Sequence, residues 1–268
     1  MQFRMFIWQM RSALPDKYGE TLLPIMNIHI GCSGYNYKEW KNIFYPGDIP
    51  RSRWLEYYSR HFNTVEINST FYSFPKVENL QKWIGETPDG FKFSIKANRY
   101  FTHLKKLNTD DPFLERLHEF NEIINKAREK VDCILWQLPG NLHKKVSKLR
   151  SFCTTLDRTV NHVIEFRHPS WFDEAVYDVL RDEGVAWCMI SAPNGLPEDT
   201  VTTGNTGYLR FHGKTKWYDY LYTDAELEEW KYRLDSLTGI EHLYIYFNND
   251  QHGNAVKNAR KLNHLFNQ

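Results

Sequence analysis

The sequence predicts an α/β protein, a (β/α)8 barrel of the TIM type with a closed parallel sheet. Three observations favour this fold. Eight short apolar or alternating segments recur along the 268 residues, and segments with an apolar repeat of three or four residues lie between most of them. No G-x-G-x-x-G follows the first segment, as it would in a dinucleotide-binding sheet. Alternating strands and helices form parallel βαβ units, and eight such units fit a closed barrel of this length.

Eight segments have the length and residue types of strands. They are rich in β-branched and aromatic residues, and several alternate polar with apolar positions. The predicted strands are residues 28–35, 64–72, 91–98, 131–139, 162–168, 185–192, 207–213 and 242–250.

Helices are predicted between most of these strands, from apolar residues three or four apart. Pro50 and Pro112 suit first turns, and Ser170-x-x-Asp173 and Thr223-x-x-Glu226 resemble capping boxes. The connection between the sixth and seventh strands is short and rich in proline and glycine, so the sixth helix is predicted to be short or missing. The apolar repeats are Trp54, Tyr58 and Phe62; Phe113, Leu117, Phe120 and Ile124; Val176 and Leu180; Leu227, Trp230 and Leu234; and Ala259, Leu262 and Phe266.

The first predicted strand comes directly after Met26. Residues 1–25 are therefore predicted to be an N-terminal extension and residues 26–268 a single TIM-type barrel domain, since no linker or repeat marks another boundary. The start of the chain lacks the features of an export signal, and no run approaches the ~20 apolar residues of a membrane span. We predict a cytoplasmic protein with no membrane partner.

The charge balance excludes a protein that attracts polyanions through its overall field. Lysine and arginine total 34, aspartate and glutamate total 33, and the net charge is +1. Nucleic-acid binding would need a local patch, for which residues 96–106 and 143–150 are candidates, although the second run is expected to be a solvated surface. The four cysteines have no C-x-x-C spacing and indicate neither a disulfide framework nor a zinc knuckle.

Polar residues share one face near the C-terminal ends of five predicted strands. Residues two apart in a strand point the same way, and the alternate positions here are apolar, as packing against helices requires. The polar side chains are therefore expected to enter the lumen at the end where this fold places active sites. A buried network that only stabilises the barrel is the alternative. The polar sets are Glu66, Asn68 and Thr70; Ser94, Lys96 and Asn98; Glu165 and Arg167; Arg210 and His212; and Asn248 and Asp250.

The same regions carry a set of recognisable motifs. They are Gly31-x-Ser33-Gly34-Tyr35-x-Tyr37-x-x-Trp40 with Phe44-Tyr45-Pro46, Glu66-x-Asn68-x-Thr70-Phe71-Tyr72-x-x-Pro75, Lys96 with Thr102-His103, Gln137-Leu138-Pro139, Glu165-Phe166-Arg167-His168 with Ser170-Trp171, Arg210-Phe211-His212-Gly213, and Tyr246-Phe247-Asn248-Asn249-Asp250 with Gly253, Ala255 and Asn258-Ala259. Over about residues 28–266 the chain thereby resembles the domain-of-unknown-function family 72, the YecE-like proteins. The resemblance implies a TIM-type barrel but no reaction, because the family's activity is not established. Two places depart from the family pattern: Gly140 replaces a frequent second proline, and Ser191-Ala192-Pro193 stands where an acidic residue is expected.

Acid-base chemistry needs a side chain that titrates near neutral pH, which histidine does unaided and glutamate does when burial raises its pKa. We expect Glu66, Glu165 and His212 to be catalytic; the alternative for His212 is a turn set by the following glycine. Other residues expected to bind the ligand are Ser33, Tyr35, Asn68, Tyr72, Lys96, His103, Gln137, Arg167, His168, Arg210, Lys214, Asn248, Asn249 and Asp250.

The loops after the seventh and eighth strands suggest an anion site. Barrels often bind phosphate there with a helix N-terminus, and these loops carry Lys214 and the turn Gly253-Asn254, close to Arg210. Ordinary turns with a solvated lysine are the alternative. An aromatic rim in the βα loops would stack sugars or bases, or only pack the loops. The rim residues are Tyr35, Tyr37, Trp40, Tyr72, Trp171, Trp217, Tyr218 and Tyr220.

Three function classes remain open. The first is a soluble barrel enzyme that acts on a small anionic, polyhydroxylated or phosphorylated ligand by acid-base chemistry at the C-terminal mouth. The second is a nucleic-acid-binding or repair-type, endonuclease-like barrel, and the third is a non-catalytic ligand sensor. No metal site is predicted, because three cations compete for the carboxylates. The sequence indicates no particular cofactor or oligomeric state.

Overall fold

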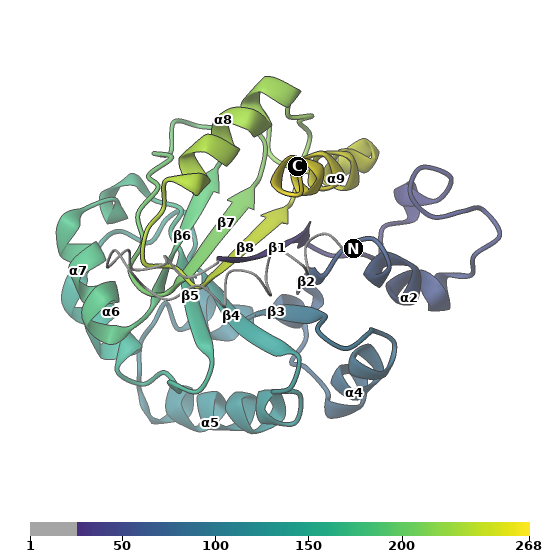
Figure 1. The fold of residues 1–268 in the computed structure, drawn as a ribbon. Coiled ribbons are helices and arrows are strands. Elements are labelled where there is room, and N and C mark those ends of the chain that lie inside the picture. The colour runs from purple at the N-terminus through teal and green to yellow at the C-terminus, as the bar shows by residue number, and fades with distance from the viewer. Residues whose placement is uncertain (1–25) are drawn as a thin grey trace, which may run out of the picture.

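The computed structural model describes residues 26–268, and the predicted extension over residues 1–25 lies outside this range. Eight parallel strands surround one lumen in the order β1-β8-β7-β6-β5-β4-β3-β2, so that strands adjacent in sequence are neighbours in space (Figure 1). The barrel prediction is confirmed. The strands are β1 Asn27–Cys32, β2 Thr64–Ile67, β3 Lys92–Lys96, β4 Val131–Gln137, β5 Asn161–Glu165, β6 Ala186–Ser191, β7 Thr206–Phe211 and β8 His242–Phe247.

The helices lie outside the strands (Figure 1). Residues 192–205, between β6 and β7, contain no helix, as the proline and glycine content predicted. The α-helices are α2 Trp54–Ser59, α3 Ser69–Tyr72, α4 Val77–Gly85, α5 Asp111–Asn125, α6 Val146–Cys153, α7 Glu174–Glu183, α8 Asp224–Asp235 and α9 Asn254–Phe266; shorter turns are η1 Lys38–Trp40, η2 Arg51–Arg53, η3 Tyr100–Leu104, η4 Pro169–Trp171 and η5 Gln251–Gly253.

Capping residues set where two of these helices begin. The Thr223–Glu226 capping box is present at α8, where each side chain bonds the other residue's backbone N–H. The box predicted at Ser170 is wrong: Asp173 caps α7 by accepting from the Ala175 N–H. Ser170 lies in η4 instead, and its hydroxyl accepts a hydrogen bond from the Lys144 N–H.

The second predicted strand is too long. It ends at Ile67, and residues 69–72 turn into α3 because Asn68 already has helical backbone angles. The Thr70 hydroxyl consequently bonds the carbonyls of Ile67 and Lys96, and the Asn98 amide donates to the Thr70 carbonyl. Strand alternation therefore does not extend to Thr70 or Asn98, which instead fix the loops after β2 and β3.

The seam between β1 and β2 closes differently from the other seven. One isolated bridge joins Ser33 to Glu66, and otherwise side chains replace the ladder. The Asn63 amide accepts from the Ile30 N–H at 3.2 Å and donates to the Ile28 carbonyl at 3.1 Å. The Tyr58 hydroxyl accepts from the Cys32 N–H and donates to the Thr64 carbonyl. The sheet is thus nearly closed, with these two side chains completing it.

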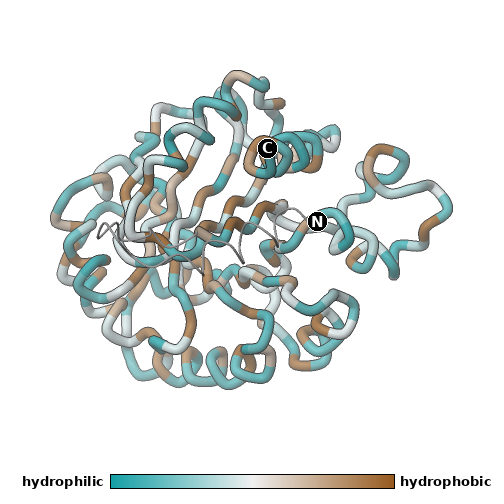
Figure 2. Tube along the Cα trace, viewed as in Figure 1, coloured by the Kyte–Doolittle hydropathy of each residue, from teal (hydrophilic) through white to brown (hydrophobic). Residues whose placement is uncertain are grey.

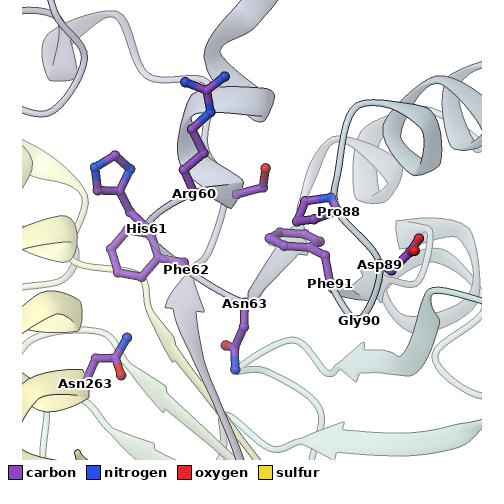
Figure 3. Close-up of a pocket in the computed structure, with 10 residues that line it drawn as sticks. Arg60, His61, Phe62, Asn63, Pro88, Asp89, Gly90, Phe91 and Asn263 are labelled. Atoms are coloured by element: carbon purple, nitrogen blue, oxygen red, sulfur yellow. The ribbon is translucent and has the colours of Figure 1, made fainter. Parts of the chain in front are cut away.

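A pocket of about 370 Å³ lies beside this seam, at the N-terminal ends of β2 and β3 (Figure 3). Residues 59–63 and 88–91 form its two sides, and Asn263 of α9 lies across from them. The pocket is therefore at the end of the barrel opposite to the predicted site.

Apolar packing occurs on both sides of the sheet. The larger core lies between the strands and the helices and includes Val65, Ile95 and Phe211. A smaller cluster fills the lumen, with Leu135, Val163, Cys188 and Tyr208. In Figure 2 the strands carry much of the brown, whereas the helices alternate between brown and teal along their turns. The lumen is a packed interior rather than a pore, as barrels of this size require.

Candidate functional site

Arg210 is the centre of the polar cluster and is completely buried in the lumen. From β7, its guanidinium donates to Glu66 Oε1 on β2 at 2.6 Å and to Glu165 Oε2 on β5. The Tyr208 hydroxyl donates to Glu66 Oε2 at 2.7 Å, and Ser33 Oγ lies 3.5 Å from the guanidinium. One arginine thereby joins two buried carboxylates from opposite sides of the barrel.

The charges of this cluster hold each other in the ionised state. Burial raises the pKa of Glu165, but Arg167, Arg210 and His212 outweigh it and keep that pKa well below its usual range. Burial lowers the pKa of Arg210, but the charges of Glu165 and Glu66 outweigh burial and hold this pKa above its usual value. Glu165 is therefore an anion at neutral pH, which suits a charge partner better than a proton donor.

Arg167 connects the buried pairs to the mouth of the barrel. Its Nε donates to Glu165 Oε1, and its guanidinium carbon lies 4.3 Å from the centre of the Trp217 ring. Its side chain retains 11% of its exposure, whereas Arg210 and both glutamates retain none. Arg167 is therefore the arginine of the cluster that solvent reaches.

His212 is buried beside Arg167 and is held from both ring nitrogens. Nδ1 lies 3.0 Å from the Asn248 amide nitrogen, and Nε2 lies 3.2 Å from Glu165 Oε1. Arg167 Nη2 also lies 3.1 Å from Nε2, so a neutral ring either donates from Nε2 to Glu165 or accepts there from Arg167, depending on the tautomer. Burial and the Arg167 charge lower the pKa of His212 to about 3, against the pull of Glu165. His212 is thus uncharged at neutral pH, and both of its ring nitrogens have polar neighbours.

Lys96 lies at the end of β3 near the same charges but outside their ion pairs. Its Nζ donates to Gln137 Oε1 at 2.6 Å and lies 4.2 Å from the centre of the Phe71 ring. Burial, followed by the charge of Arg210, lowers the pKa of Lys96 to about 7, although Glu165 and Glu66 act in the opposite direction. Lys96 therefore titrates near neutral pH, whereas Glu165 does not.

Three further predicted residues lie at the rim around Lys96. Asn68 has a buried Oδ1 with no hydrogen-bond partner in the described part of the chain. The His103 ring packs edge-on against Phe71, and burial together with Lys96 lowers its pKa. Tyr72 also contacts Phe71 but is 73% exposed. These residues are placed to contact a molecule that enters the mouth.

The other predicted ligand residues have structural partners elsewhere. Tyr35 lines a separate pocket of about 280 Å³ with Arg51 and Trp83. His168 accepts from the Ser170 N–H and packs on the His143 ring. The buried Asn249 amide donates to the Tyr220 carbonyl and to Asn258. Strand and loop position alone did not separate these side chains from the central cluster.

Asp250 lies next to the cluster and lines a different cavity. Its main-chain carbonyl accepts from the Trp40 indole, and the cavity, of about 570 Å³, is shared with Tyr37, Glu39 and His252. Burial, with a smaller contribution from Glu39, raises the pKa of Asp250 to about 6. The pKa of this carboxyl therefore lies closer to neutrality than that of Glu165, which the neighbouring cations hold low.

Arg210 and Lys214, the two cations expected to bind an anion, both have carboxylate partners in the structure. Arg210 is sealed and already binds two carboxylates, and Lys214 lies 3.3 Å from the α8 residue Glu226. A side chain at Gly253, which precedes α9, would meet Ile43. Arg210 pairs with the lumen carboxylates, as in the alternative of a buried network, whereas Lys214 pairs with a glutamate of α8 that the sequence did not place near it.

The structure shows what surrounds the two positions that depart from the family pattern, Ser191 and Gly140. Ser191 donates to Glu198 Oε1 at 2.7 Å, so an acidic group from the following loop does lie against the end of β6. Glu198 also pairs with Arg233 of α8, which places it toward the helices. Gly140 lies against the Arg167 backbone, where a Cβ would fit in ordinary contact.

The sequence prediction missed Tyr208 and Phe71 as members of the site. Tyr208 stands two residues before Arg210 and so shares its face, a signal that was present in the alternation. Phe71 had no such signal, because it lies in α3, where the strand prediction was wrong. Within residues 26–268, no three His, Cys, Asp or Glu side chains are grouped as a metal site would require, and no helix is long and apolar enough to cross a membrane.

Comparison with known proteins places the chain in a family. Residues 29–268 match the family described as "Protein of unknown function DUF72". The chain belongs to the DUF72 family. Several of its motif residues, among them Ser33, Glu66, Lys96, Arg210 and His212, lie in the cluster described above.

Two curated relatives match this DUF72 chain in sequence, and a solved DUF72 structure matches it in fold. The UPF0759 protein YunF of Bacillus subtilis is 28% identical, over 88% of this chain and 93% of its own. YecE of Escherichia coli is 29% identical over 59% of this chain and 55% of its own. A DUF72 protein of Thermotoga maritima superposes with a TM-score of 0.79 at 26% identity, covering 90% of this chain and all of the other.

Two structures outside the family share the barrel only. A D-psicose 3-epimerase, solved in the presence of D-fructose, has a TM-score of 0.53 at 11% identity and covers 90% of this chain and 98% of its own. A structure titled SacUVDE has the same TM-score at 8% identity, with the same coverage. At these identities the likeness concerns the fold.

Proposed function

We propose that this DUF72 protein is a barrel enzyme that acts on a small anionic or polyhydroxylated ligand by acid-base chemistry at the carboxyl ends of its strands. One observation carries the proposal. Two cationic side chains, Lys96 and Arg167, lie at the mouth above a sealed set of ion pairs, and each lies over an aromatic ring. The proposed ligand is a phosphorylated or carboxylated sugar-like molecule.

The charges beneath the mouth support this choice. Glu66 and Glu165 balance Arg210 and Arg167, so a protonated Lys96 leaves the cluster with an excess positive charge. In a low-dielectric cleft such a charge attracts an anion more strongly than on the surface. Arg167 would bind the anionic group, and Trp217 and Phe71 would contact the carbon skeleton.

The proton-transfer role falls to Lys96. Glu165 stays ionised and His212 stays neutral through the physiological range, so neither exchanges a proton readily there. Lys96 can take a proton from a carbon or hydroxyl group and return it. Glu66, Glu165 and His212 would then fix Arg210 and Arg167 in place, a revision of the catalytic roles first expected for them.

Calorimetric titration with inorganic phosphate and with hexose phosphates tests the proposal. We expect binding by the wild type and a loss of about tenfold or more in Arg167→Met, since a charged hydrogen bond contributes about 1.5–3 kcal/mol. Arg53→Met is the matched control, because Arg53 pairs with Glu56 on the exposed surface. Absence of binding, or equal binding by all three proteins, would refute the proposal. Binding without any turnover would favour the ligand sensor.

A nucleic-acid-binding barrel is the second candidate, favoured by a different observation. The two basic runs meet: burial lowers the pKa of Lys148, and the charges of Lys145 and Lys106 lower it further. Lys106 also acts on His103 at the rim, where Tyr72 and Leu104 are exposed. A basic strip with exposed aromatic and apolar residues is typical of single-strand binding.

Salt dependence separates the two candidates. A nucleic-acid reader would bind single-stranded DNA with an affinity that falls steeply between about 50 and 200 mM salt. The double charge reversal Lys106→Glu and Lys148→Glu would abolish that binding, whereas Lys231→Glu on α8 is the control. Weak binding with no effect of the double variant would remove this candidate. A cytoplasmic location is also part of our proposal, and fractionation of cells that express the chain tests it.

A further inference from the structure

We propose that Lys96 is an amine nucleophile that forms a Schiff base with an aldehyde or ketone substrate. This inference rests on the proposed function and names its substrate class: a small carbonyl compound that carries an anionic group. Lys96 differs from Lys92 and Lys130 of the same barrel in its hydrogen bonds and ion pairs.

Within the described part of the chain, an ammonium group at Lys96 would have one hydrogen-bond acceptor and the face of the Phe71 ring, but no carboxylate. A protonated lysine has three N–H donors. Among residues 26–268 the Nζ atom has one hydrogen-bond acceptor, Gln137 Oε1, and no carboxylate oxygen within 4.0 Å. The oxygens of Glu66 and Glu165 are already bound by Arg210, Arg167 and Tyr208. A neutral amine, which donates one bond to Gln137 and keeps its lone pair, fits this environment better.

Lys130 and Lys92 show the opposite arrangement. The buried Nζ of Lys130 donates to the carbonyls of Ile84 and Thr87 and to the Thr87 hydroxyl, so all three protons have acceptors. Lys92, on the same strand as Lys96, pairs with Asp132 at 3.0 Å. Both are satisfied as cations, and neither has a lone pair available. Of these three lysines, Lys96 is therefore the one that has a single hydrogen-bond acceptor and no carboxylate partner among the described residues.

The surroundings of Lys96 suit addition to a carbonyl. The cations Arg210 and Arg167, with the anions Glu165 and Glu66 and the His103 ring, are the charged and titratable groups that act on it. Burial and the two arginines favour the neutral amine, as in other enzymes that use a lysine nucleophile. Arg167, being partly exposed, would bind the anionic group of the substrate and bring its carbonyl toward Nζ.

The step balances without an added oxidant or reductant. The Nζ lone pair attacks the carbonyl carbon, the carbonyl π electrons move to oxygen, and that oxygen takes up a proton. Nitrogen then loses a proton, the hydroxyl group takes one up, and water leaves as the C=N bond forms. The protonated imine so formed then releases the remaining N–H proton. The net change is amine plus carbonyl to imine plus water.

Reductive trapping tests the inference on the full chain. The protein is mixed with glyceraldehyde 3-phosphate or acetaldehyde and sodium cyanoborohydride at pH 7.5, and each lysine is followed by peptide mass spectrometry. We expect modification of Lys96 about 100-fold faster than of exposed Lys82, because ordinary lysine amines titrate near 10.4. Lys96→Met removes this fast reaction. A Lys96 rate no greater than that of Lys82 would overturn the inference.

A second variant changes the charge of the nucleophile without removing it. Gln137→Glu places a carboxylate where Gln137 Oε1 now lies, 2.6 Å from Nζ, and is expected to stabilise the ammonium and slow trapping about tenfold or more. Gln81→Glu on α4 makes the same chemical change at a site where the amide only donates to the Lys126 carbonyl. Equal trapping in Gln137→Glu and Gln81→Glu would contradict the inference.

Phosphate titration of the same samples distinguishes the two proposals. Phosphate binding without fast trapping of Lys96 would leave the anion-binding enzyme and reject the Schiff base, with Lys96 acting as a charge. Neither binding nor trapping would reject both. Fast trapping of Lys96 by acetaldehyde in a protein that binds no phosphate would support the nucleophile and reject the anionic substrate.

Discussion

Arg210 illustrates how one side chain can hold a barrel together across its lumen. It is fully buried and contacts Glu66 from β2 and Glu165 from β5. A buried ion pair gains little overall, because desolvation offsets the attraction, but its parts depend strongly on each other. The sequence left open whether these polar residues form a functional site or a network that only stabilises the barrel. The structure combines the two, because the buried residues stabilise the barrel, and Arg167 and Lys96 face the mouth.

Replacing Arg210 should therefore be costly. In Arg210→Met both buried carboxylates lose the charge of Arg210, and Glu66 keeps only the Tyr208 hydroxyl, so we expect a loss of about 3–5 kcal/mol in the free energy of unfolding. Urea denaturation monitored by tryptophan fluorescence measures it. Lys82→Met, which removes an exposed partner of Glu86, should cost no more than about 1 kcal/mol. A similar small loss in Arg210→Met would show that the network contributes little to stability.

His212 should make stability depend on pH. The unfolded chain protonates this ring below about 6.5, whereas the folded protein does so only near 3, so stability is lost as the pH falls through this window. The slope due to His212 is at most about 1.4 kcal/mol per pH unit between pH 6.5 and 4.5. His29 and His162, whose pKa values burial lowers to about 4, add to the wild-type slope.

The variant His212→Asn should flatten this slope, and urea denaturation at several pH values measures the change. His118→Asn, at an exposed position of α5, is the control that should leave the slope as in the wild type. An unchanged slope in His212→Asn would mean that the folded protein protonates this ring as easily as the unfolded chain does.

Among the elements, β1 is the strand with the least regular attachment. It pairs with β8 along its whole length, but its other edge meets β2 through one bridge and through the side chains of Asn63 and Tyr58. Gly31 permits this close approach, since a Cβ there would lie 2.1 Å from the Thr64 carbonyl oxygen. The side chains of Tyr58 and Asn63 therefore take the place of the backbone hydrogen bonds that would join β1 to β2. They also set the position of Ser33 next to Arg210.

Tyr58→Phe should weaken this seam. The substitution leaves the buried Cys32 N–H and Thr64 carbonyl without the Tyr58 hydroxyl, and we expect a loss of about 1–3 kcal/mol. Thermal unfolding followed by circular dichroism measures it, with faster amide hydrogen exchange expected at Cys32. Tyr57→Phe, one residue earlier on α2, removes a hydroxyl from a ring whose contacts are apolar or aromatic, and should have little effect. Equal losses in both variants would count against the role of the seam.

The molecule as a whole has two chemically different ends. At the N-terminal end, His29 stacks on Tyr244, whose hydroxyl bonds Asp132, and these side chains close the lumen. Above them Tyr246 bonds Thr64 and Ser94. Among residues 26–268, these side chains fill the lumen below the Arg210 cluster, whereas Arg167 and Lys96 lie toward its C-terminal mouth.

Residues 26–268 are expected to fold on their own. All eight strands and the site residues lie in this range, so a chain that starts at Met26 should unfold in one cooperative transition, within about 1 kcal/mol of the full chain. Chemical denaturation with two spectroscopic probes tests this. A chain that starts at Gly34, and so lacks β1, is the control and should lose cooperativity. Loss of the single transition in the first chain would place residues 1–25 within the folding unit.

Local patterns were sufficient for most of the architecture. Apolar repeats and alternation predicted eight strands, the missing sixth helix and the inward direction of Glu66, Glu165, Arg210 and His212, because alternation follows directly from strand geometry. They were insufficient past the strand ends, where Thr70, Asn98 and Phe71 adopt loop or helical backbone set by hydrogen bonds between β2 and β3.

The amino-acid order alone determined the (β/α)8 barrel, because its signals are periodic and extend along each segment. Which charges meet was decided only by the tertiary structure. Arg210 bridges residues 144 and 45 positions away, and Lys214 turns to Glu226 rather than to the mouth. Ion pairing depends on distances of a few ångströms between distant segments, and sequence spacing does not encode them. For the same reason, the sequence does not distinguish Lys96 from Arg167 and Arg210. Only the tertiary structure of residues 26–268 shows that Lys96 has no carboxylate partner.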